Sequence, residues 1–320
     1  MTTAVPTGRL ELTLAPRGER TVAVHQFHRG ALRVLRPHHL DGSGQPCFVV
    51  VNPGGGYLGG DRYELDVTVG AAGTALVTTQ SATKVYRTPA APARQDVRLA
   101  LGPGAVLEYL PDQLIAYEDA DYVQSTTVTM DPSACLVAGE VVTPGWAPDG
   151  TVFRYRGVVL RTEVLMGGRT VVLDNLRLRP GEDAVAGLGF LEGRTHLGSL
   201  LVVDPRADRE LVEEVHGLLA AAEARVPGLR CGVSELPVPG LVVRALGPGN
   251  RVSAAASRSW TSSTSSRSAR GSMTSRDPRC VRPSRKPSSA TASSPGRSRR
   301  LSRTTVRPPI STSVRSTTPR

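Results

Sequence analysis

The clearest pattern of apolar and polar positions runs from Cys47 to Asp66, in the stretch CFVVVNPGGGYLGGDRYELD. An apolar run ends at Val51, a glycine-crowded stretch follows, and Tyr63 begins an alternation that places every second residue on one face. Continuous apolar runs and period-two alternation are both typical of β-strands. The pattern predicts two strands joined by a loop in which glycine allows positive φ angles or the close approach of another segment.

Short alternating runs continue along most of the chain, and glycine and proline interrupt them. They cover residues 9–34, 74–88, 104–131 and 134–203. Short strands with turns about every 8–12 residues favour an antiparallel β architecture. A sandwich, a barrel and an irregular β-solenoid all fit this pattern.

One helix is predicted after Asp204 and Pro205, where apolar residues recur at helical spacing against an acidic face. The apolar positions are Leu211, Val212, Val215, Leu218, Leu219 and Ala222. The helix should end before Pro227 and cover a face or an edge of a sheet. A last strand is expected over residues 241–247.

Residues 54–59, GGGYLG, match the G-x-G-x-x-G spacing of dinucleotide-binding loops. That motif requires a helix directly after the loop, whereas this chain continues as a strand. No acid between Asp66 and Asp96 could bind a ribose, and no Gly-Lys-Ser/Thr follows the loop. We therefore attribute the match to glycine-rich sequence and expect no tightly bound cofactor.

The formal net charge of +11 is unevenly distributed. Residues 251–320 hold 16 basic residues and one acid, Asp277, so the first 250 residues hold 23 basic and 27 acidic groups, a net charge of −4. This mildly acidic body argues against a nucleic-acid partner. The tail is rich in Ser, Arg, Thr and Pro and lacks the apolar residues of a core. We therefore divide the chain into a β-rich domain, 1–250, and a disordered tail, 251–320.

Two hypotheses account for the tail. An arginine- and serine-rich segment can bind RNA, but these serines and arginines form no regular dipeptide repeat. We favour a shifted reading frame in GC-rich coding DNA from Arg251 onward. Resequencing the gene tests this hypothesis, because an intact frame through codon 251 would contradict it.

Cysteines and histidines give no clear metal site. The four cysteines, at positions 47, 135, 231 and 280, form no C-x-x-C pair, so a structural zinc site is not expected. His25 and His28 would point to opposite faces of a strand, and with His38 and His39 we interpret them as partly exposed, leaving a metal-related role as the alternative. The chain opens without a signal-peptide pattern and has no apolar run of about 18 residues, so we predict a cytoplasmic protein with no membrane partner.

Polar residues on predicted strands are the remaining candidates for chemistry. A row of hydroxyls either faces solvent or lines a polar channel or an interface; its members are Thr74, Thr78, Thr79, Ser81 and Thr83. Glu140 follows the apolar residues 136–138, a setting that raises the proton affinity of a carboxylate unless it is paired. Acids also collect at residues 118–121, without a partnering nucleophile.

Several short motifs, in this order and spacing, resemble the UreD (UreH) family of urease accessory proteins. They are Asn52-Pro53-Gly54-Gly55-Gly56 with Gly59-Gly60-Asp61, then Thr78-Thr79, then Ala82-Thr83-Lys84-Val85-Tyr86-Arg87, and Leu107-Glu108-Tyr109-Leu110-Pro111. Each is weakly specific, and the combination is fairly specific over about residues 9–250. The family's usual helical C-terminal segment does not follow Asn250, which supports the hypothesis of a shifted frame.

The resemblance implies a mainly β fold: a stacked-strand, β-solenoid-like single domain with one or two helices packed on it. It also implies a non-enzymatic urease maturation factor. Such a scaffold binds the urease apoprotein through the urease structural subunits and recruits UreF and the GTPase UreG. In this role nickel is a cargo in transit through a polar internal tunnel, destined for the urease active site.

Nickel in transit needs oxygen ligands that bind weakly enough to release it. We select Asp61, Thr79, Glu108 and Glu140 as metal-passage residues on this ground. The glycine loop and the motif that follows it are assigned a structural or partner-binding role; these residues are Asn52, Gly54, Gly55, Gly56, Gly59, Gly60, Lys84, Tyr86 and Arg87.

The alternative function is a carbohydrate-binding or -processing β protein. Its site would combine the acidic turn at residues 118–121 with Tyr117 and Tyr122. The presence of only two tryptophans weakens this alternative, because sugar platforms rely on large stacking rings.

Overall fold

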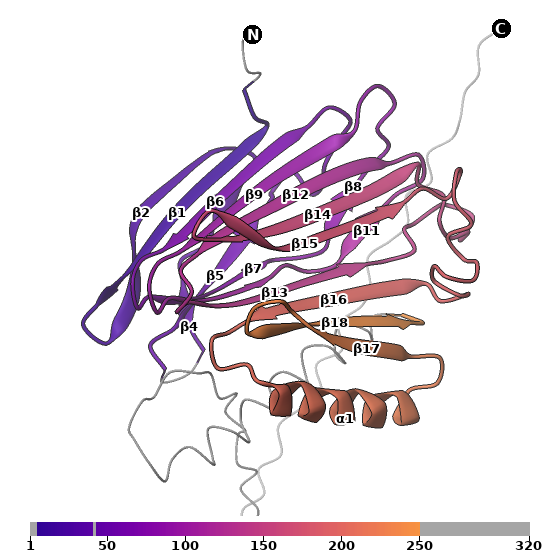
Figure 1. Cartoon of the computed structure of the whole chain (residues 1–320). Coiled ribbons are helices and arrows are strands. Elements are labelled where there is room, and N and C mark those ends of the chain that lie inside the picture. The colour runs from indigo at the N-terminus through magenta and orange to yellow at the C-terminus, as the bar shows by residue number, and fades with distance from the viewer. Residues whose placement is uncertain (1–4, 41–42, 250–320) are drawn as a thin grey trace, which may run out of the picture. The chain divides into compact units, whose positions relative to one another are not determined.

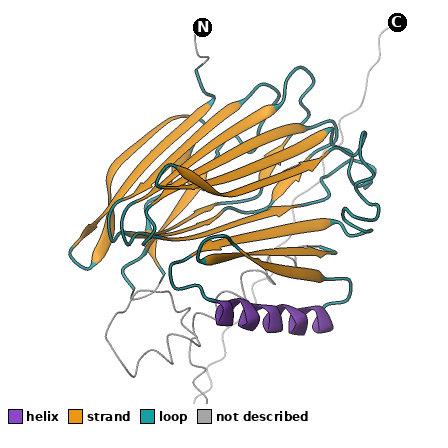
Figure 2. Ribbon diagram, in the orientation of Figure 1, coloured by secondary structure: helices purple, strands orange, loops and turns teal. Residues whose placement is uncertain are grey.

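A computed structural model describes residues 5–40 and 43–249, and this part of the chain is mainly β (Figures 1 and 2). The first sheet has seven strands in the order β15-β14-β12-β9-β6-β1-β2. In chain order they are β1 (Gly8–Arg17), β2 (Arg20–Gly30), β6 (Arg62–Val69), β9 (Ala93–Leu101), β12 (Asp121–Met130), β14 (Gly157–Met166) and β15 (Arg169–Leu178).

The second sheet has eleven strands, of which eight form the path β17-β18-β16-β13-β10-β7-β5-β3. These are β3 (Arg33–Val34), β5 (Pro46–Val51), β7 (Thr74–Thr79), β10 (Val106–Leu110), β13 (Cys135–Val142), β16 (His196–Val203), β17 (Arg230–Glu235) and β18 (Gly240–Gly247). The short strands β4 (His38–His39), β8 (Thr83–Val85) and β11 (Leu114–Ala116) pair beside this path.

The chain passes back and forth between the two sheets, so each coil contributes one strand to each of them. In the first sheet β6, β9, β12 and β14 pair in parallel, and in the second β5, β7, β10 and β13 do the same. This is the stacked-strand, solenoid-like arrangement implied by the family resemblance, which the structure confirms. The antiparallel architecture expected from short strands and closely spaced turns was wrong for the centre of the stack, because alternation fixes a strand's face but not its pairing direction.

Antiparallel pairing is confined to the ends of the stack, where the chain turns back on itself. β2 pairs with β1 at one end, and β15 pairs with β14 at the other. A short third side closes the coils, where β8 pairs in parallel with β11. Isolated bridges join Tyr57 to Val85 and Tyr117 to Trp146 on the same side. Residues of the glycine loop therefore pair with the next coil rather than projecting freely.

Stacking aligns equivalent residues of successive coils into rows between the sheets. One row of the first sheet is apolar throughout and consists of Leu12, Val67, Leu99, Val128 and Val164. It faces an equally apolar row of the second sheet, made of Ala75, Leu107, Leu136 and Val203. All nine are buried, and these rows form the main core.

The predicted helix is present as α1 (Arg209–Arg225), the one helix in the described part of the chain. Asp208 caps its start, because the Asp208 side chain accepts a hydrogen bond from the Leu211 amide at 2.9 Å. Leu211, Val215 and Leu219 are buried and pack with Val243 of β18. The helix covers the outer face of the second sheet, as its apolar stripe predicts (Figure 2). Residues 250–320, the predicted tail, lie outside the described part, and the domain boundary stays a prediction.

Candidate functional site

Polar side chains interrupt the interior at one end of the strands. In the first sheet Gln95 and Gln124 share one row, and Thr126 and Thr162 share the next. In the second sheet Glu140 lies opposite Ser199, which in turn pairs with Arg244. All of them except Arg244 share the alternation phase of buried Leu or Val residues of the main core in their strands, so they point between the sheets. Arg244 alternates with Leu241 and Val243, which pack with α1, and it shares its phase with Val242 and Leu246, which pack against the main core.

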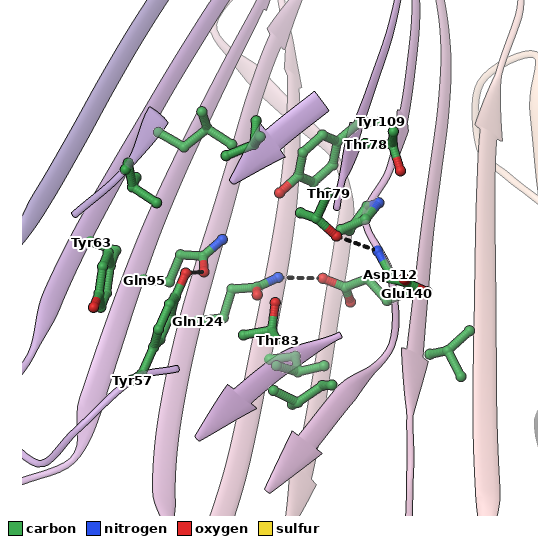
Figure 3. A pocket seen from close by; sticks show the side chains of 17 residues that line it. Tyr57, Tyr63, Thr78, Thr79, Thr83, Gln95, Tyr109, Asp112, Gln124 and Glu140 are labelled. Atoms are coloured by element: carbon green, nitrogen blue, oxygen red, sulfur yellow. Dashed lines mark hydrogen bonds between the residues drawn. The ribbon is translucent and has the colours of Figure 1, made fainter. Parts of the chain in front are cut away.

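Hydrogen bonds link these groups from the glycine loop to the second sheet. The Tyr57 hydroxyl donates to Gln95 Oε1 at 2.6 Å, and the Tyr122 hydroxyl donates to Gln124 Oε1 at 3.0 Å. The Gln124 amide then donates to Glu140 Oε1 across the space between the sheets (Figure 3). Buried polar groups need such partners, so the network stabilises an interior that apolar packing alone does not fill.

Glu140 is enclosed by protein, yet part of its surface stays accessible because cavities open beside it. The pKa of Glu140 is raised to about 7, chiefly by burial and also by the nearby Asp174 carboxylate. Arg244 and the hydrogen bond from Gln124 act in the opposite direction. The sequence-based prediction that the setting of Glu140 raises its proton affinity is confirmed, and the cause is desolvation.

Three cavities follow one another through this region. The mouth cavity is lined by Asn52, Gly56, Thr79, Thr83 and Lys84, and it reaches the surface beside the exposed Ser81. The central cavity shares Tyr57, Thr79 and Thr83 with it (Figure 3). The inner cavity is lined by Thr126, Asp174, Ser199 and Arg244, and it shares Tyr109 and Glu140 with the central cavity. Glu140 thus lies where the central and inner cavities meet.

An ion pair crosses between the sheets beside the inner cavity. Arg244 Nη2 of β18 lies 2.6 Å from Asp174 Oδ1 of β15, and Arg244 Nη1 also donates to the Ser199 hydroxyl. Glu140, Asp174 and Arg244 therefore bring two acids and one base together around one cavity, which solvent reaches on the side of Asp174 and Arg244. The positive charge of Arg244 offsets part of the repulsion between the two carboxylates.

The structure brings two of the four predicted metal-passage residues together. Thr79 and Glu140 both line the central cavity. Glu108 lies on the opposite face of the second sheet, because it alternates with the buried Leu107 and Tyr109, and it accepts a hydrogen bond from Gln45 at 3.3 Å. Asp61 lies in the glycine loop and lines none of the three cavities.

Asp61 instead fixes the shape of the loop. Its Oδ2 accepts a hydrogen bond from the Leu58 amide at 2.7 Å, and its Oδ1 accepts one from the Thr7 hydroxyl at 3.0 Å. The first donor is a backbone amide of the same loop, and the second is a side chain of the segment that precedes β1. The geometry therefore assigns Asp61 a structural contact, and its proposed contact with a metal stays a prediction without support from the cavities.

The glycines of the loop let another segment of the chain approach the loop backbone closely, as the sequence predicts. A Cβ on Gly56 would lie 2.5 Å from Tyr86 Cε2, and one on Gly59 would lie 3.0 Å from Thr88 Cα. Gly55 and Gly60 have φ angles of +82° and +80°, which favour glycine. The Asn52 side chain accepts a hydrogen bond from the Gly54 amide at 3.1 Å.

The motif after the loop completes this packing. The Lys84 carbonyl accepts a hydrogen bond from the Tyr57 amide at 2.8 Å, and the Tyr86 amide donates to the Tyr57 carbonyl at 2.9 Å. Arg87 forms an exposed ion pair with Asp119 at 3.3 Å. The loop and the motif therefore form one structural unit, and their contact with a partner stays a prediction.

Sequence reasoning missed Gln95, Gln124, Asp174 and Arg244. A signal for the two glutamines was present, because Gln95 is in phase with the buried Val97 and Leu99, and Gln124 is in phase with the buried Val128. An amide in the buried phase of a strand indicates an internal hydrogen-bond network. Asp174 and Arg244 carried no such signal, because they lie far apart in the sequence, in β15 and β18, and meet only through the fold.

The site of the carbohydrate alternative is not assembled. Tyr122 is fully buried and Glu118 forms an ion pair with Arg154 at 3.0 Å. The histidines at positions 25, 28, 38 and 39 are exposed, and within residues 5–40 and 43–249 no three His, Cys, Asp or Glu side chains form a group that could hold a metal ion. The one described helix, α1, is not long and apolar enough to cross a membrane.

Comparison with known proteins gives a consistent result. The family model described as UreD urease accessory protein matches residues 6–282. A urease accessory protein UreD from Actinomyces naeslundii is 56% identical over 241 residues, which cover 75% of this chain and 87% of that protein. UreD from Arthrobacter sp. (strain FB24) is 54% identical, over 76% of this chain and 84% of its own length. UreD from Lachnoclostridium phytofermentans is 35% identical, over 75% of this chain and 86% of its own length. Together with the stacked-strand fold, these matches show that the chain belongs to the UreD family of urease accessory proteins.

Proposed function

We propose that this chain is a non-enzymatic scaffold of urease maturation in the cytoplasm. It binds the urease apoprotein and recruits UreF and the GTPase UreG, and the assembly delivers nickel to the urease active site. Membership of the UreD family supports the role in urease maturation. The partners and the cargo are those that the family resemblance implies.

The position of Glu140 carries the more specific part of this proposal. Nickel passes from the mouth cavity through the central cavity to the inner cavity, and Glu140 borders the last two. The hydroxyl of Thr79 borders the first two. Hydroxyl, amide and carboxylate oxygens spaced along a path bind a divalent cation weakly enough to release it, unlike a closed cage of cysteine and histidine.

The electrostatics of Glu140 suit a transient ligand. Because its pKa is about 7, a cation entering the cavity can displace the proton near neutral pH without working against a strongly acidic group. Once the cation leaves, reprotonation removes an unpaired charge from a partly dry space. Asp174 offers a second carboxylate in the inner cavity, and Arg244 balances it.

Nickel loading of urease by purified variants tests the passage role. Glu140→Gln keeps the shape and the amide contact but removes the ionisable oxygen, and Thr79→Val removes the hydroxyl at constant volume. We expect the Glu140 variant to lower nickel content per urease, measured by elemental analysis, while the accessory complex still elutes intact from gel filtration. Glu108→Gln is the matched control, because Glu108 lies outside the cavities. Unchanged loading by Glu140→Gln in an intact complex would refute the passage role.

A further inference from the structure

The inner cavity has a buried end and an end that reaches solvent. Tyr109 and Thr126 line the buried end and are 4% and 3% exposed. The other end is lined by Leu173 and by the ion pair of Asp174 and Arg244, whose side chains are 31% and 40% exposed. The volume of the cavity is about 160 Å³, which is room for several water molecules. A small hydrated cation therefore fits inside it, and the ion pair lies on its solvent side.

Arg244 binds a partner on each of the two sheets. Its Nη2 lies 2.6 Å from Asp174 Oδ1 of the first sheet, and its Nη1 donates to the Ser199 hydroxyl of the second sheet. Ser199 lies opposite Glu140 in the pairing of β13 with β16. The positive charge of Arg244 also acts on Glu140, because it lowers the pKa of that carboxyl group. The guanidinium therefore lies among carboxylate and hydroxyl oxygens from both sheets.

These oxygen atoms are of the kind that divalent cations use as ligands in proteins. Two carboxylates that face one enclosed space repel each other when both are ionised. Arg244 offsets part of this repulsion, since its charge favours the ionised form of Glu140 while Asp174 opposes it. The guanidinium thus supplies the positive charge that a bound cation would supply at the same place.

Arg244 can release its partners only by moving. A guanidinium keeps its proton in proteins, so the ion pair with Asp174 is not broken by deprotonation of the arginine. Movement toward solvent is open to Arg244, because its side chain is already partly exposed. A divalent cation carries twice the charge of a guanidinium and attracts a carboxylate more strongly at the same distance. It can therefore take the place of the guanidinium beside Asp174.

We propose that Arg244 is a displaceable counter-ion that competes with the cargo cation for Asp174 and Glu140. The cation binds these two carboxylates when the guanidinium moves outward, and the returning guanidinium helps to expel it. Arg244 thereby keeps the site weak enough to release its cargo. The identity of the cargo rests on the proposed function, whereas the competition rests on the ion pair and on the cavity that it borders.

Nickel binding by the purified full chain tests this inference, with nickel chloride alone as the probe and isothermal titration calorimetry as the measurement. Arg244→Met removes the charge and keeps a long side chain. A guanidinium that occupies the site in about nine of ten molecules weakens cation binding about tenfold, so we expect the variant to bind Ni²⁺ about tenfold more tightly than the wild type.

Arg161→Met is the matched control. Arg161 also forms a partly exposed ion pair, with Glu163 at 3.0 Å, but it alternates with the buried Thr162 and points away from the inner cavity. The variant loses the same charge as Arg244→Met and should bind Ni²⁺ like the wild type. Thermal unfolding of each variant verifies that it is folded.

Two further variants separate competition for the site from a change in packing. Arg244→Lys keeps the positive charge and should bind Ni²⁺ nearly as weakly as the wild type, although a lysine packs differently from an arginine. Glu140→Gln added to Arg244→Met removes one of the two carboxylates and should abolish the gain in affinity. The gain therefore reports on charge at this cavity and not on binding elsewhere in the chain.

Three results would overturn the inference. The first is a gain of less than threefold in folded Arg244→Met, which includes the case in which neither this variant nor the wild type binds Ni²⁺ measurably. The second is an equal gain in Arg244→Lys, and the third is a gain that persists when Glu140→Gln is added. The passage role is judged separately, by nickel loading of urease, so either proposal can fail while the other stands.

Discussion

The interior of the solenoid has two regions that share the same strands and differ in chemistry. In β9, Leu99 belongs to the apolar region and Gln95 belongs to the polar region. Gln95 lies four residues before Leu99 and points to the same face of the strand. In β12 the same contrast holds between Val128 and Gln124. Because the strands stack in parallel, equivalent positions of successive coils lie side by side in a row. A strand position that is polar in several coils therefore forms a polar layer.

This contrast teaches that the fold separates its apolar packing from its polar hydrogen-bond network along the strand axis. The apolar rows bury side chains of Leu and Val, each contributing about 1.5–3 kcal/mol by removal from water. The polar rows replace that gain with hydrogen bonds of smaller net value, about 0.5–1.5 kcal/mol each. The polar region therefore contributes less to stability and leaves cavities in which oxygen atoms of Thr79, Gln124 and Glu140 join a mainly apolar lining.

The largest effect should come from breaking the apolar region. Leu99→Ala removes a fully buried side chain and should lower the free energy of unfolding by about 2–5 kcal/mol. Urea denaturation measures this change. Leu173→Ala is the control, because Leu173 is 60% exposed and should change stability by about 0.5 kcal/mol or less. Equal effects of the two variants would show that the row through Leu99 is not the core.

The second effect concerns the pH dependence of stability in the polar region. The pKa of Glu140 is raised from 4.5 to about 7 in the folded protein, so the native state binds a proton that the unfolded state has lost between these values. The free energy of unfolding contributed by Glu140 is therefore present below pH 4.5 and is lost as the pH rises through 7, a change on the order of 3 kcal/mol.

Glu140→Gln should remove this dependence. The stability of the variant relative to the wild type should rise between pH 5 and pH 8, as measured by urea denaturation at both values. Glu108→Gln controls for the loss of a carboxylate outside the cavities. A constant difference between Glu140→Gln and the wild type across this range would contradict the assigned burial of the carboxylate.

A third, smaller effect tests the hydrogen bonds of the polar rows. Gln95→Leu leaves the Tyr57 hydroxyl without its 2.6 Å acceptor and should cost about 1–3 kcal/mol of stability. Adding Tyr57→Phe removes the orphaned hydroxyl, so the double variant should be more stable than Gln95→Leu alone. If the two substitutions simply add, the hydrogen bond contributes nothing beyond packing.

The smallest expected change in stability comes from a residue outside both regions, and it serves as a reference for the other variants. Asp208→Ala removes the side chain that caps α1 and should cost about 1 kcal/mol. Asp208→Asn should retain most of that stability, because asparagine also caps helices well. Thermal unfolding measures both. A loss as large as that of Leu99→Ala would mean that α1 is integral to the main core rather than packed on its outer face.

The sequence by itself determined the strands, the helix and the strand–loop–strand unit at residues 47–69. These are local properties: alternation fixes which residues share a face, helical spacing fixes the stripe of α1, and five glycines mark a loop in which the backbone can take positive φ or be approached closely. It also indicated Glu140, because an acid among apolar residues has an unusual proton affinity wherever it lies.

Only the tertiary structure decided which polar groups meet. Pairing direction and the register between coils depend on loops and packing, and a period of two carries no information about either. For that reason the sequence could not show that Glu140 faces Gln124, that Arg244 reaches Asp174, or that Asp61 and Glu108 lie away from the cavities. The candidate path depends on polar residues that occupy buried positions in successive coils. The stacking of the coils brings these residues next to one another.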